Sequence, residues 1–373
     1  MVTRTAVEAT SGTREPTMHP HTTIGPRGLP TSLVIGPLRI APPLILAPME
    51  GVTDLPFRRL IRSIGGTGLT CTEFIPGAGL ARGDDRWVKM AELDPDEHPV
   101  SIQIYGREPA VMAEAARAVQ DLGADIVDIN MGCPSRKVCA HSGGSALMRE
   151  PARVAAIVAA CRAAVDVPLT VKMRSGFDHD HRNAPELAAI CESEGADAIT
   201  IHWRTRADGY GGRRAVDRIA AAVDRVDIPV IGNGDVVDIA SAVAMFRDTG
   251  CDGVMIGRGA LADPWVFRTV STWLSGGEPQ PAPWHERAAI LRRYLALCMA
   301  HFAEPRAGRR KRHDPARVSL GRFKQLARYL LADTGETRQS ILRSRTIDEA
   351  LAVLSAWEAR QAPAAAEIGA SPG

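Results

Sequence analysis

Short apolar runs alternate with Ala-rich helical segments through the middle of the chain. We predict eight strands, which cover residues 44–49, 69–72, 100–105, 126–130, 169–172, 198–202, 230–232 and 253–256. Apolar residues at helical spacing predict helices between several of these strands, over 109–122, 151–164, 185–194, 216–226 and 239–247. This alternation is typical of parallel strands joined by right-handed crossovers, and eight such units predict an α/β fold of the (β/α)8 TIM-barrel type.

The main alternative is a doubly wound open sheet. That fold would have a Gly-x-Gly-x-x-Gly turn after its first strand. The chain has Ala-Pro-Met-Glu-Gly at 47–51 instead. A weak internal repeat supports the register of the predicted strands, since Gly-Ala-Asp at 123–125 and 195–197 and Gly-Cys-Asp at 250–252 stand just before the fourth, sixth and eighth strands.

The two ends of the chain have different patterns from the barrel region. Residues 1–32 are rich in Thr, Pro, Gly and Ser without periodicity, so we expect a disordered extension before a barrel over 33–274. A Pro- and Gly-rich linker is expected over 275–283, and helical patterns without strand signals follow over 284–360. We therefore predict a small all-helical C-terminal domain, with a disordered tail over 361–373.

Composition narrows the class of protein further. The chain has 373 residues, of which 45% are hydrophobic and 24% charged, as in an ordinary soluble globular protein. No apolar run approaches the roughly 18 residues of a membrane span, and the N-terminus lacks a signal-peptide segment, so we expect a cytoplasmic protein without a membrane partner. The seven cysteines have irregular spacing, which indicates reduced thiols and no CxxC zinc pair.

Candidate chemistry lies where the predicted strands end. The run at 126–134 turns polar at Asn130 and then reads Gly-Cys-Pro, so a buried strand ends in a tight turn that presents the thiol of Cys133. In a barrel of this kind the carboxyl ends of the strands form the mouth where reactive groups gather. The other strands end in the same way, at Met49, Glu50, Gln103, Lys172, His202, Asn233, Gly257 and Arg258.

Two turns late in the barrel are suited to binding phosphate. Gly-Asn-Gly-Asp at 232–235 follows the seventh strand, and Gly-Arg-Gly at 257–259 follows the eighth. Glycines let backbone N–H groups approach an anion, and Arg258 supplies a guanidinium. We therefore expect a phosphorylated cofactor. We expect no metal site, because His179 and His181 have no nearby cysteine and no repeated His spacing.

Six segments, in order along the chain, resemble the successive motifs of the tRNA-dihydrouridine synthases. They are Ala-Pro-Met-Glu-Gly-Val-Thr-Asp at 47–54, Asn-Met-Gly-Cys-Pro-Ser at 130–135, Val-Lys-Met-Arg at 171–174, Ile-His-Trp-Arg-Thr-Arg at 201–206, Gly-Asn-Gly-Asp at 232–235 and Ile-Gly-Arg-Gly-Ala-Leu at 256–261. A basic helical C-terminal domain also belongs to that family. One departure is Trp203, which stands where the family more often has Gly.

The resemblance implies a function for the barrel. Members of this family contain FMN and reduce the 5,6 double bond of a tRNA uridine to 5,6-dihydrouridine, with NADPH reducing the FMN. By this resemblance Cys133 would protonate C5 while C6 receives a hydride from FMN. The residues that would bind the cofactor are Pro48, Met49, Glu50, Gln103, Lys172, His202, Asn233, Gly234, Asp235, Gly257 and Arg258.

The charge distribution is consistent with an RNA substrate. Residues 283–358 carry an excess of Lys and Arg, whereas the rest of the chain is net acidic. Phosphate contacts would give this domain a salt-dependent affinity for tRNA, and the target uracil must leave its stack to reach the barrel. The expected RNA-binding residues are Arg306, Arg309, Arg310, Lys311, Arg312, Arg317, Arg322, Lys324 and Arg328.

Other functions stay open from the residues alone. An FMN-dependent oxidoreductase of a free pyrimidine or related small molecule would use the same barrel, but it would not need a basic helical domain. Dihydrouridine formation in rRNA is a second alternative. An RNA-binding protein with a degenerate barrel and a lyase that uses Lys172 as a Schiff base are two more. No obligate protein partner is implied, and the modified uridine is not identified.

Overall fold

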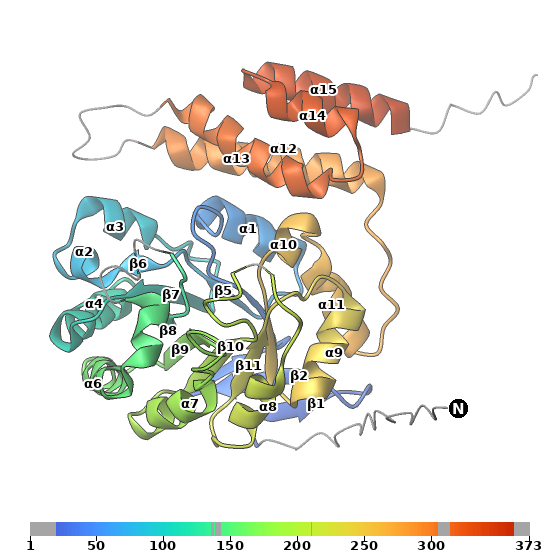
Figure 1. Cartoon of the computed structure of the whole chain (residues 1–373). Helices are drawn as coiled ribbons and strands as arrows, with labels where there is room; N and C mark the ends of the chain where they lie inside the picture. Colours follow the sequence, from blue (N-terminus) through green and yellow to red (C-terminus); the bar gives the residue numbers. More distant parts are fainter. Residues whose placement is uncertain (1–19, 136–137, 139–142, 210, 305–313, 362–373) are drawn as a thin grey trace, which may run out of the picture.

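The predicted barrel is present in the computed structural model, which describes residues 20–135, 138, 143–209, 211–304 and 314–361 (Figure 1). The barrel strands are β4 (Leu44–Leu46), β5 (Leu69–Cys71), β7 (Val100–Tyr105), β8 (Ile126–Met131), β9 (Leu169–Arg174), β10 (Ala198–His202), β11 (Val230–Asn233) and β12 (Gly253–Ile256). These strands pair in parallel and in chain order, and the pairings of β12 with β4 and of β5 with β7 close the barrel. A two-residue strand, β6 (Ile75–Pro76), extends the pairing beside the end of β7.

Helices cover the outer face of the strands (Figure 1). Local capping signals start two of them: Asp54 accepts the N–H of Phe57 at the start of α1, and Asp238 forms a capping box with Ser241 at the start of α9. The surrounding helices are α1 (Leu55–Ile64), α4 (Pro109–Asp121), α6 (Pro151–Arg162), α7 (Ala184–Ser193), α8 (Asp217–Val223), α9 (Ile239–Thr249) and α11 (Val266–Leu274). Shorter segments follow strand ends, namely α2 (Gly77–Ala81), α3 (Asp85–Met90), η1 (Gly144–Arg149) and α10 (Gly259–Ala262).

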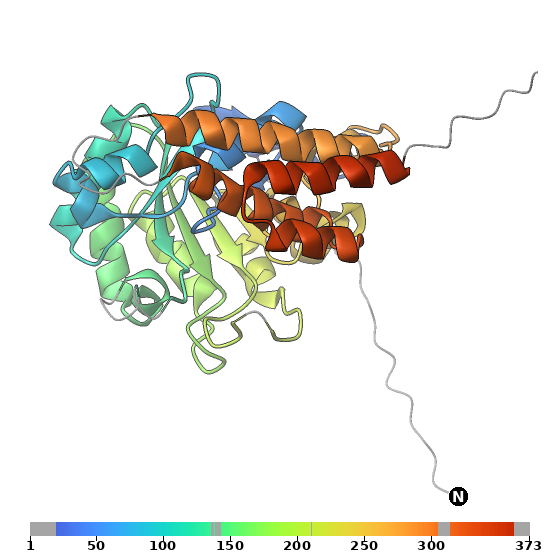
Figure 2. The ribbon, with the colours of Figure 1, turned by 90° about the horizontal axis from the view of Figure 1, so that it is seen from above.

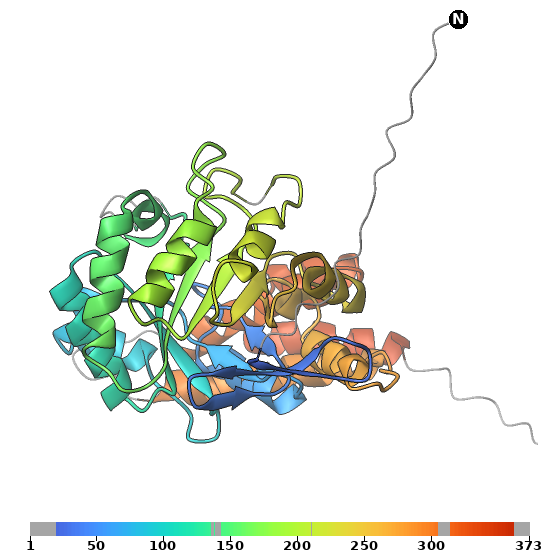
Figure 3. The same ribbon diagram turned by 90° about the horizontal axis from the view of Figure 1, so that it is seen from below.

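A small antiparallel sheet precedes the barrel and lies across its amino-terminal end (Figure 3). Its strands are β1 (Thr22–Ile24), β2 (Pro30–Ile35) and β3 (Leu38–Ile40). Leu33 and Ile35 are fully buried and share an apolar cluster with Ile45 and Ile231 of the barrel strands. The expectation of disorder over 1–32 was therefore wrong for residues 20–32, and residues 1–19 lie outside the described part. The error arose because these strands are short and bury their apolar side chains against the barrel, which local periodicity does not reveal.

The helical C-terminal domain was predicted correctly. It consists of α12 (Trp284–Ala303), α13 (Pro315–Leu330), α14 (Glu336–Arg343) and α15 (Ile347–Gln361). The domain lies over the carboxyl ends of the strands, with α12 beside α1 and α13 beside α10, and α14 and α15 lie on the side away from the barrel (Figures 1 and 2). Phe57 of α1 and Tyr294 of α12 make an edge-to-face contact with ring centroids 5.9 Å apart. Among the helices of the described ranges, none has the length and apolar character needed to cross a membrane.

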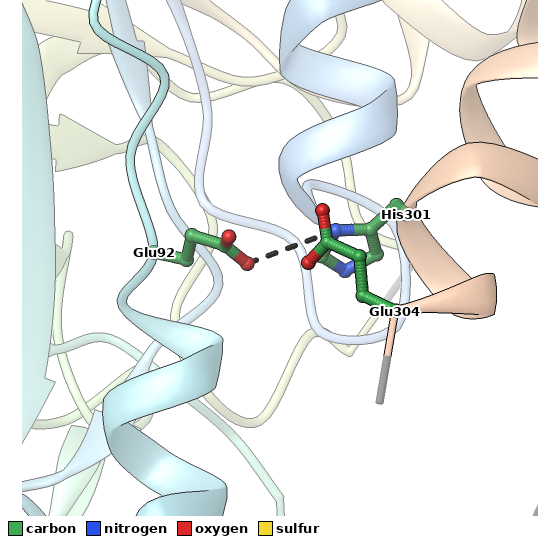
Figure 4. Close-up of side chains that lie close together, drawn as sticks. All are labelled: Glu92, His301 and Glu304. Carbon is green, nitrogen blue, oxygen red and sulfur yellow. Dashed lines mark ion pairs between the residues drawn. The ribbon is translucent and has the colours of Figure 1, made fainter. Parts of the chain in front are cut away.

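A polar cluster adds a second contact between the barrel and α12 (Figure 4). Glu92, His301 and Glu304 place their carboxylate and imidazole atoms within 4.8 Å of one another, an arrangement that also occurs at metal sites. Here Lys89 Nζ lies 2.7 Å from a carboxylate oxygen of Glu92 and 2.7 Å from one of Glu304. The lysine already supplies the positive charge, so the cluster acts as a salt-bridge network between the end of α3 and the end of α12.

Candidate active site

A buried chain of hydrogen bonds joins β7, β8 and β9 inside the barrel. Gln103 Nε2 donates to Asp128 Oδ2 at 2.5 Å, and Asn130 Nδ2 donates to Gln103 Oε1 at 2.6 Å. Thr170 donates its hydroxyl to the other carboxylate oxygen of Asp128 at 2.6 Å. Burial raises the pKa of Asp128 to about 6. The network fixes the amide of Gln103, whose second Nε2 proton has no acceptor among the described residues.

The turn after β8 positions Cys133. Asn130 Oδ1 accepts the backbone N–H groups of Gly132 at 3.1 Å and Cys133 at 2.9 Å. The Cys133 carbonyl accepts the backbone N–H and the hydroxyl of Ser145, and Arg174 Nε donates to the Gly132 carbonyl at 2.8 Å. Cys133 is 9% exposed. The sequence pattern pointed to this thiol, and the structure shows that Asn130 and Arg174 fix the backbone that carries it.

Tyr105 is a neighbour of Cys133 that the sequence did not single out. Burial raises the pKa of its phenol, and the charges of Cys133 and Glu50 raise the pKa further. Its ring meets Phe74 edge to face, with centroids 5.6 Å apart. Tyr105 Cδ2 would lie 3.6 Å from a Cβ on Gly143, so the end of β7 lies beside the segment that follows the cysteine turn.

Lys172 reaches across the barrel mouth to β11. Its Nζ donates to Asn233 Oδ1 at 3.1 Å, and Asn233 Nδ2 donates to the Met255 carbonyl at 2.8 Å. Burial lowers the pKa of Lys172 to about 8, and the neighbouring Arg174 lowers it too. The Lys172 side chain is therefore positively charged at neutral pH and loses this charge in mildly alkaline solution.

His202 is held as a neutral imidazole at the end of β10. Its Nδ1 accepts the backbone N–H of Arg204 at 3.0 Å, which places the ring proton on Nε2. Burial lowers the pKa of His202 well below its ordinary value, and the positive charge of Lys172 lowers it further. At neutral pH this side chain is a hydrogen-bond donor without net charge.

The two glycine turns after β11 and β12 meet at Asp235. Gly234 has φ +123°, and a Cβ there would lie 2.5 Å from the Trp203 ring, so only glycine fits. Asp235 accepts two hydrogen bonds from Arg204, at 2.9 and 2.6 Å, and one from Arg258 at 2.8 Å. These arginines hold the pKa of Asp235 below its usual range against the effect of its partial burial. Its carboxylate therefore orients Arg258, a role that the sequence did not suggest.

Trp203 fills the space beneath Gly234. The indole is 2% exposed, and the Arg204 guanidinium lies 4.0 Å from its ring centroid. Within the described residues its Nε1 has no hydrogen-bond partner. The residue that departs from the family pattern therefore packs under the glycine turn, and none of the described residues accepts its buried N–H.

Removing the Trp203 ring is expected to destabilise the protein. Trp203→Ala should lower the free energy of unfolding by about 3–5 kcal/mol, because it leaves a cavity under Gly234. Urea titration followed by circular dichroism measures this loss. Trp203→Phe keeps most of the packing and should lose clearly less. An Ala variant as stable as the wild type would show that the ring is not packed as described.

The described residues fit a flat, phosphorylated cofactor. Gly234, Gly257 and the half-exposed Arg258 would form the phosphate end, and Asp235 fixes the arginine. Lys172, His202 and Gln103 offer one cation and neutral N–H donors nearer the cysteine turn. The Trp203 N–H, which has no acceptor among the residues that the structure describes, lies beside Gly234. These groups come from five strands and the turns that follow them, and they converge at the barrel mouth.

The predicted RNA-binding residues have different surroundings. Residues 305–313, which include Arg306, Arg309, Arg310, Lys311 and Arg312, lie outside the described part of the chain. Arg317 is exposed near the start of α13. A cavity of about 540 Å³ on the same helix is lined by Arg322, Lys324 and Arg328, together with Gln325 and the 40% exposed Tyr329. Lys324 and Arg322 also make contacts within the protein, and those of Arg322 reach the barrel.

A (β/α)8 barrel with this mouth defines a class: an enzyme that binds a phosphorylated cofactor beside a cysteine turn. Two solved structures have a similar fold, with TM-scores of 0.52 and 0.50: 6-hydroxypseudooxynicotine (6-HPON) amine oxidase (HisD) from Pseudomonas geniculata N1 and histamine dehydrogenase from Rhizobium sp. 4-9. They are 12% and 14% identical to this chain over 66% and 71% of its length. The match covers 49% and 50% of those chains, so this likeness shows the fold alone.

Sequence relatives narrow the class to one family. The model of the dihydrouridine synthase (Dus) family matches residues 45–347. The tRNA-dihydrouridine synthase B of Pseudomonas aeruginosa is 43% identical over 72% of this chain and 81% of its own length. The tRNA-dihydrouridine synthase B of Xanthomonas campestris is 45% identical over 67% of this chain and 75% of its own length. The probable tRNA-dihydrouridine synthase of Rhodobacter capsulatus is 45% identical over 64% of this chain and 74% of its own length. The chain belongs to the dihydrouridine synthase family.

Proposed function

We propose that this protein reduces the 5,6 double bond of a uridine in tRNA to give 5,6-dihydrouridine. The observation that carries the proposal is the family match over most of the chain, together with relatives named for this reaction. The geometry of the mouth supports it, because a fixed cysteine turn stands beside groups that suit a phosphorylated cofactor.

FMN is the cofactor that we propose for this site. Gly234, Gly257 and Arg258 would hold its phosphate, and Asp235 would orient Arg258. Pro48, Met49 and Glu50 would line the cofactor from the turn after β4. Gln103, Lys172, His202 and Asn233 would face its ring system and ribityl chain. When bound, this cofactor supplies the hydride for C6 of the uracil, after receiving it from NADPH.

Cys133 supplies the proton in this proposal. Its thiol gives a proton to C5 while C6 gains the hydride, so the double bond is reduced and a thiolate remains, which regains its proton from solvent. An ordinary thiol, with a pKa near 8.5, is protonated at neutral pH and needs no further activation for this role. Asn130 and Arg174 keep the cysteine turn in place during the step.

The basic helical domain would bind the RNA. Arg317, Lys324 and Arg328, together with the basic run at 306–312, would contact phosphates, so affinity would fall with salt. Recognition would depend mainly on tRNA shape, and the uracil would have to be turned out of its stack to enter the barrel. We propose a cytoplasmic enzyme that acts without an obligate protein partner.

The affinity for FMN is expected to depend on pH through Lys172. With a pKa of about 8, its ammonium is present at pH 7 and largely lost at pH 9, whereas an ordinary lysine would stay charged. FMN should therefore bind about tenfold or more weakly at pH 9, because a hydrogen bond from a charged donor is lost. Fluorescence titration of FMN measures this. Lys172→Met should bind weakly at both values, and a wild-type affinity that does not change would exclude this role for Lys172.

The reaction itself can be tested with purified protein. The protein is incubated with FMN, NADPH and tRNA taken from cells that lack the gene, and dihydrouridine is measured by mass spectrometry. We expect its formation at a defined position. Parallel reactions replace the tRNA with rRNA or with a free pyrimidine such as uracil. NADPH oxidation with the free pyrimidine, and no product in tRNA, would instead favour an oxidoreductase of small molecules. Product in rRNA alone would identify rRNA as the substrate.

A further inference from the structure

The turn between β4 and α1 is held by charged side chains from two distant segments. It carries Met49 and Glu50 and closes with hydrogen bonds from the N–H groups of Val52 and Thr53 to the Met49 carbonyl, at 3.0 and 3.1 Å. Its central residue, Gly51, has φ +71°. This left-handed conformation favours glycine at the position. The conformation of this turn decides where Met49 and Glu50 lie in the mouth.

Both backbone polar groups of Gly51 are bound to charged side chains. Its N–H donates to Glu73 Oε1, on the segment that follows β5. Its carbonyl accepts from Arg322 Nη1, which comes from α13 in the helical domain. One glycine is therefore fixed from the barrel on one side and from the C-terminal domain on the other.

Arg322 also balances the buried carboxylates around this turn. Its Nε lies 3.0 Å from Asp54 Oδ2, and the Asp54 side chain is 9% exposed. Asp54 caps α1 through its other oxygen. Burial raises the pKa of both Asp54 and Glu73, and Arg322 opposes this in each case. Without the guanidinium, two neighbouring buried carboxylates would lack their main counter-charge.

The turn between β4 and α1 also packs against the proposed phosphate end of the cofactor site. Met49 Sδ would be 3.5 Å from a Cβ on Gly257, so the thioether lies in ordinary contact with the turn that carries Arg258. The backbone N–H of Ala47 also donates to the Ile256 carbonyl at 2.9 Å. A shift of the turn would therefore move groups at the cofactor site, although Arg322 itself lies in the helical domain.

We propose that Arg322 is a positioning residue for the cofactor site and not an RNA contact. It fixes Gly51 and Asp54 so that Met49 and Glu50 keep their place beside the cofactor. This inference rests on the proposed FMN site, and it changes the role that the basic pattern of α13 suggested. Arg328 lines the same cavity, is exposed, and has no contact with the turn among the described residues, so it serves as a matched control.

The test measures two affinities on full-length protein. FMN affinity is measured by fluorescence, and tRNA affinity is measured at several salt concentrations. Arg322→Met should weaken FMN binding about tenfold and shift the flavin absorption spectrum, because a charge-assisted hydrogen bond to the turn is lost. Its tRNA affinity should keep the wild-type salt dependence. Arg328→Met should bind FMN normally. Its plot of log tRNA affinity against log salt concentration should have a slope that is smaller in magnitude by about one unit.

Two further variants separate positioning from general folding. Arg322→Lys keeps a positive donor beside Asp54 and should restore most of the FMN affinity and the spectrum. If Arg322→Met does not fold, Arg322→Gln replaces it, and weaker FMN binding is expected there too. Unchanged FMN binding in the folded Met or Gln variant would overturn the inference. Wild-type protein that binds no FMN would instead refute the proposed function, so the two failures can be told apart.

Discussion

Cys133→Ala is expected to lose dihydrouridine formation by about 10²–10⁴-fold while binding FMN and tRNA normally. The size follows from the contribution of general acid catalysis, and the thiol is the only acid that we assign to the step. The backbone bonds of the cysteine turn come from Asn130, Arg174 and Ser145 and do not use the thiol, so the turn should survive the substitution. Single-turnover assays with saturating tRNA measure the loss directly.

A matched cysteine serves as the control for this result. Cys161 lies buried in α6, and burial raises its pKa to about 12. Cys161→Ala should therefore keep near-normal turnover. If Cys133→Ala reduced tRNA at the wild-type rate, proton donation by Cys133 would be refuted. Loss of FMN in that variant would point to a structural role for the cysteine instead.

Arg58→Met is expected to lower the free energy of unfolding by about 3–5 kcal/mol. Arg58 and Glu97 form a fully buried bidentate pair, with both N···O distances 2.9 Å. Arg58 also donates to the Thr53 and Glu92 carbonyls, at 3.0 and 2.8 Å. Removing the guanidinium leaves the Glu97 carboxylate buried without its counter-charge, which is a larger effect than losing an exposed ion pair.

An exposed ion pair provides the comparison for Arg58. Arg287 and Asp333 lie 2.9 Å apart with side chains 34% and 66% exposed. Arg287→Met should change the free energy of unfolding by about 1 kcal/mol at most. Guanidinium titration of Arg58→Met and of Arg287→Met measures the two free energies of unfolding. The double variant Arg58→Met, Glu97→Leu should regain much of the lost stability, because no uncompensated charge remains. Equal losses for the two single variants would contradict this account.

The barrel, and the convergence of several candidate site residues at its mouth, could be predicted from the sequence because both depend on local pattern. Strand ends in a (β/α)8 barrel converge at one mouth, so Lys172 and Asn233 could be placed together although they are far apart in the chain. Their contact at 3.1 Å agrees with this expectation. The same reasoning placed Gln103 and Cys133 on neighbouring strands, and Asn130 links them, although Gln103 lies inside β7 and not at its end.

The features that were missed depend on contacts between distant segments. Asp235 looked like part of a phosphate turn, but its carboxylate pairs with Arg204 and Arg258, which follow two other strands. Arg322 stood within a basic pattern, and only the position of α13 shows that its guanidinium faces the barrel. The sheet at residues 22–40 was missed for the same reason, since its core is supplied by the barrel. The charge and periodicity of a sequence do not show which distant side chains will contact each other.

The most direct test of the central claim is mass-spectrometric mapping of dihydrouridine in total tRNA and rRNA from cells with and without this gene. We expect the modification to disappear from a defined tRNA position in cells that lack the gene. Wild-type protein should restore it, and Cys133→Ala should not. An unchanged dihydrouridine map, with a purified protein that still binds FMN, would contradict the assignment of tRNA as the substrate.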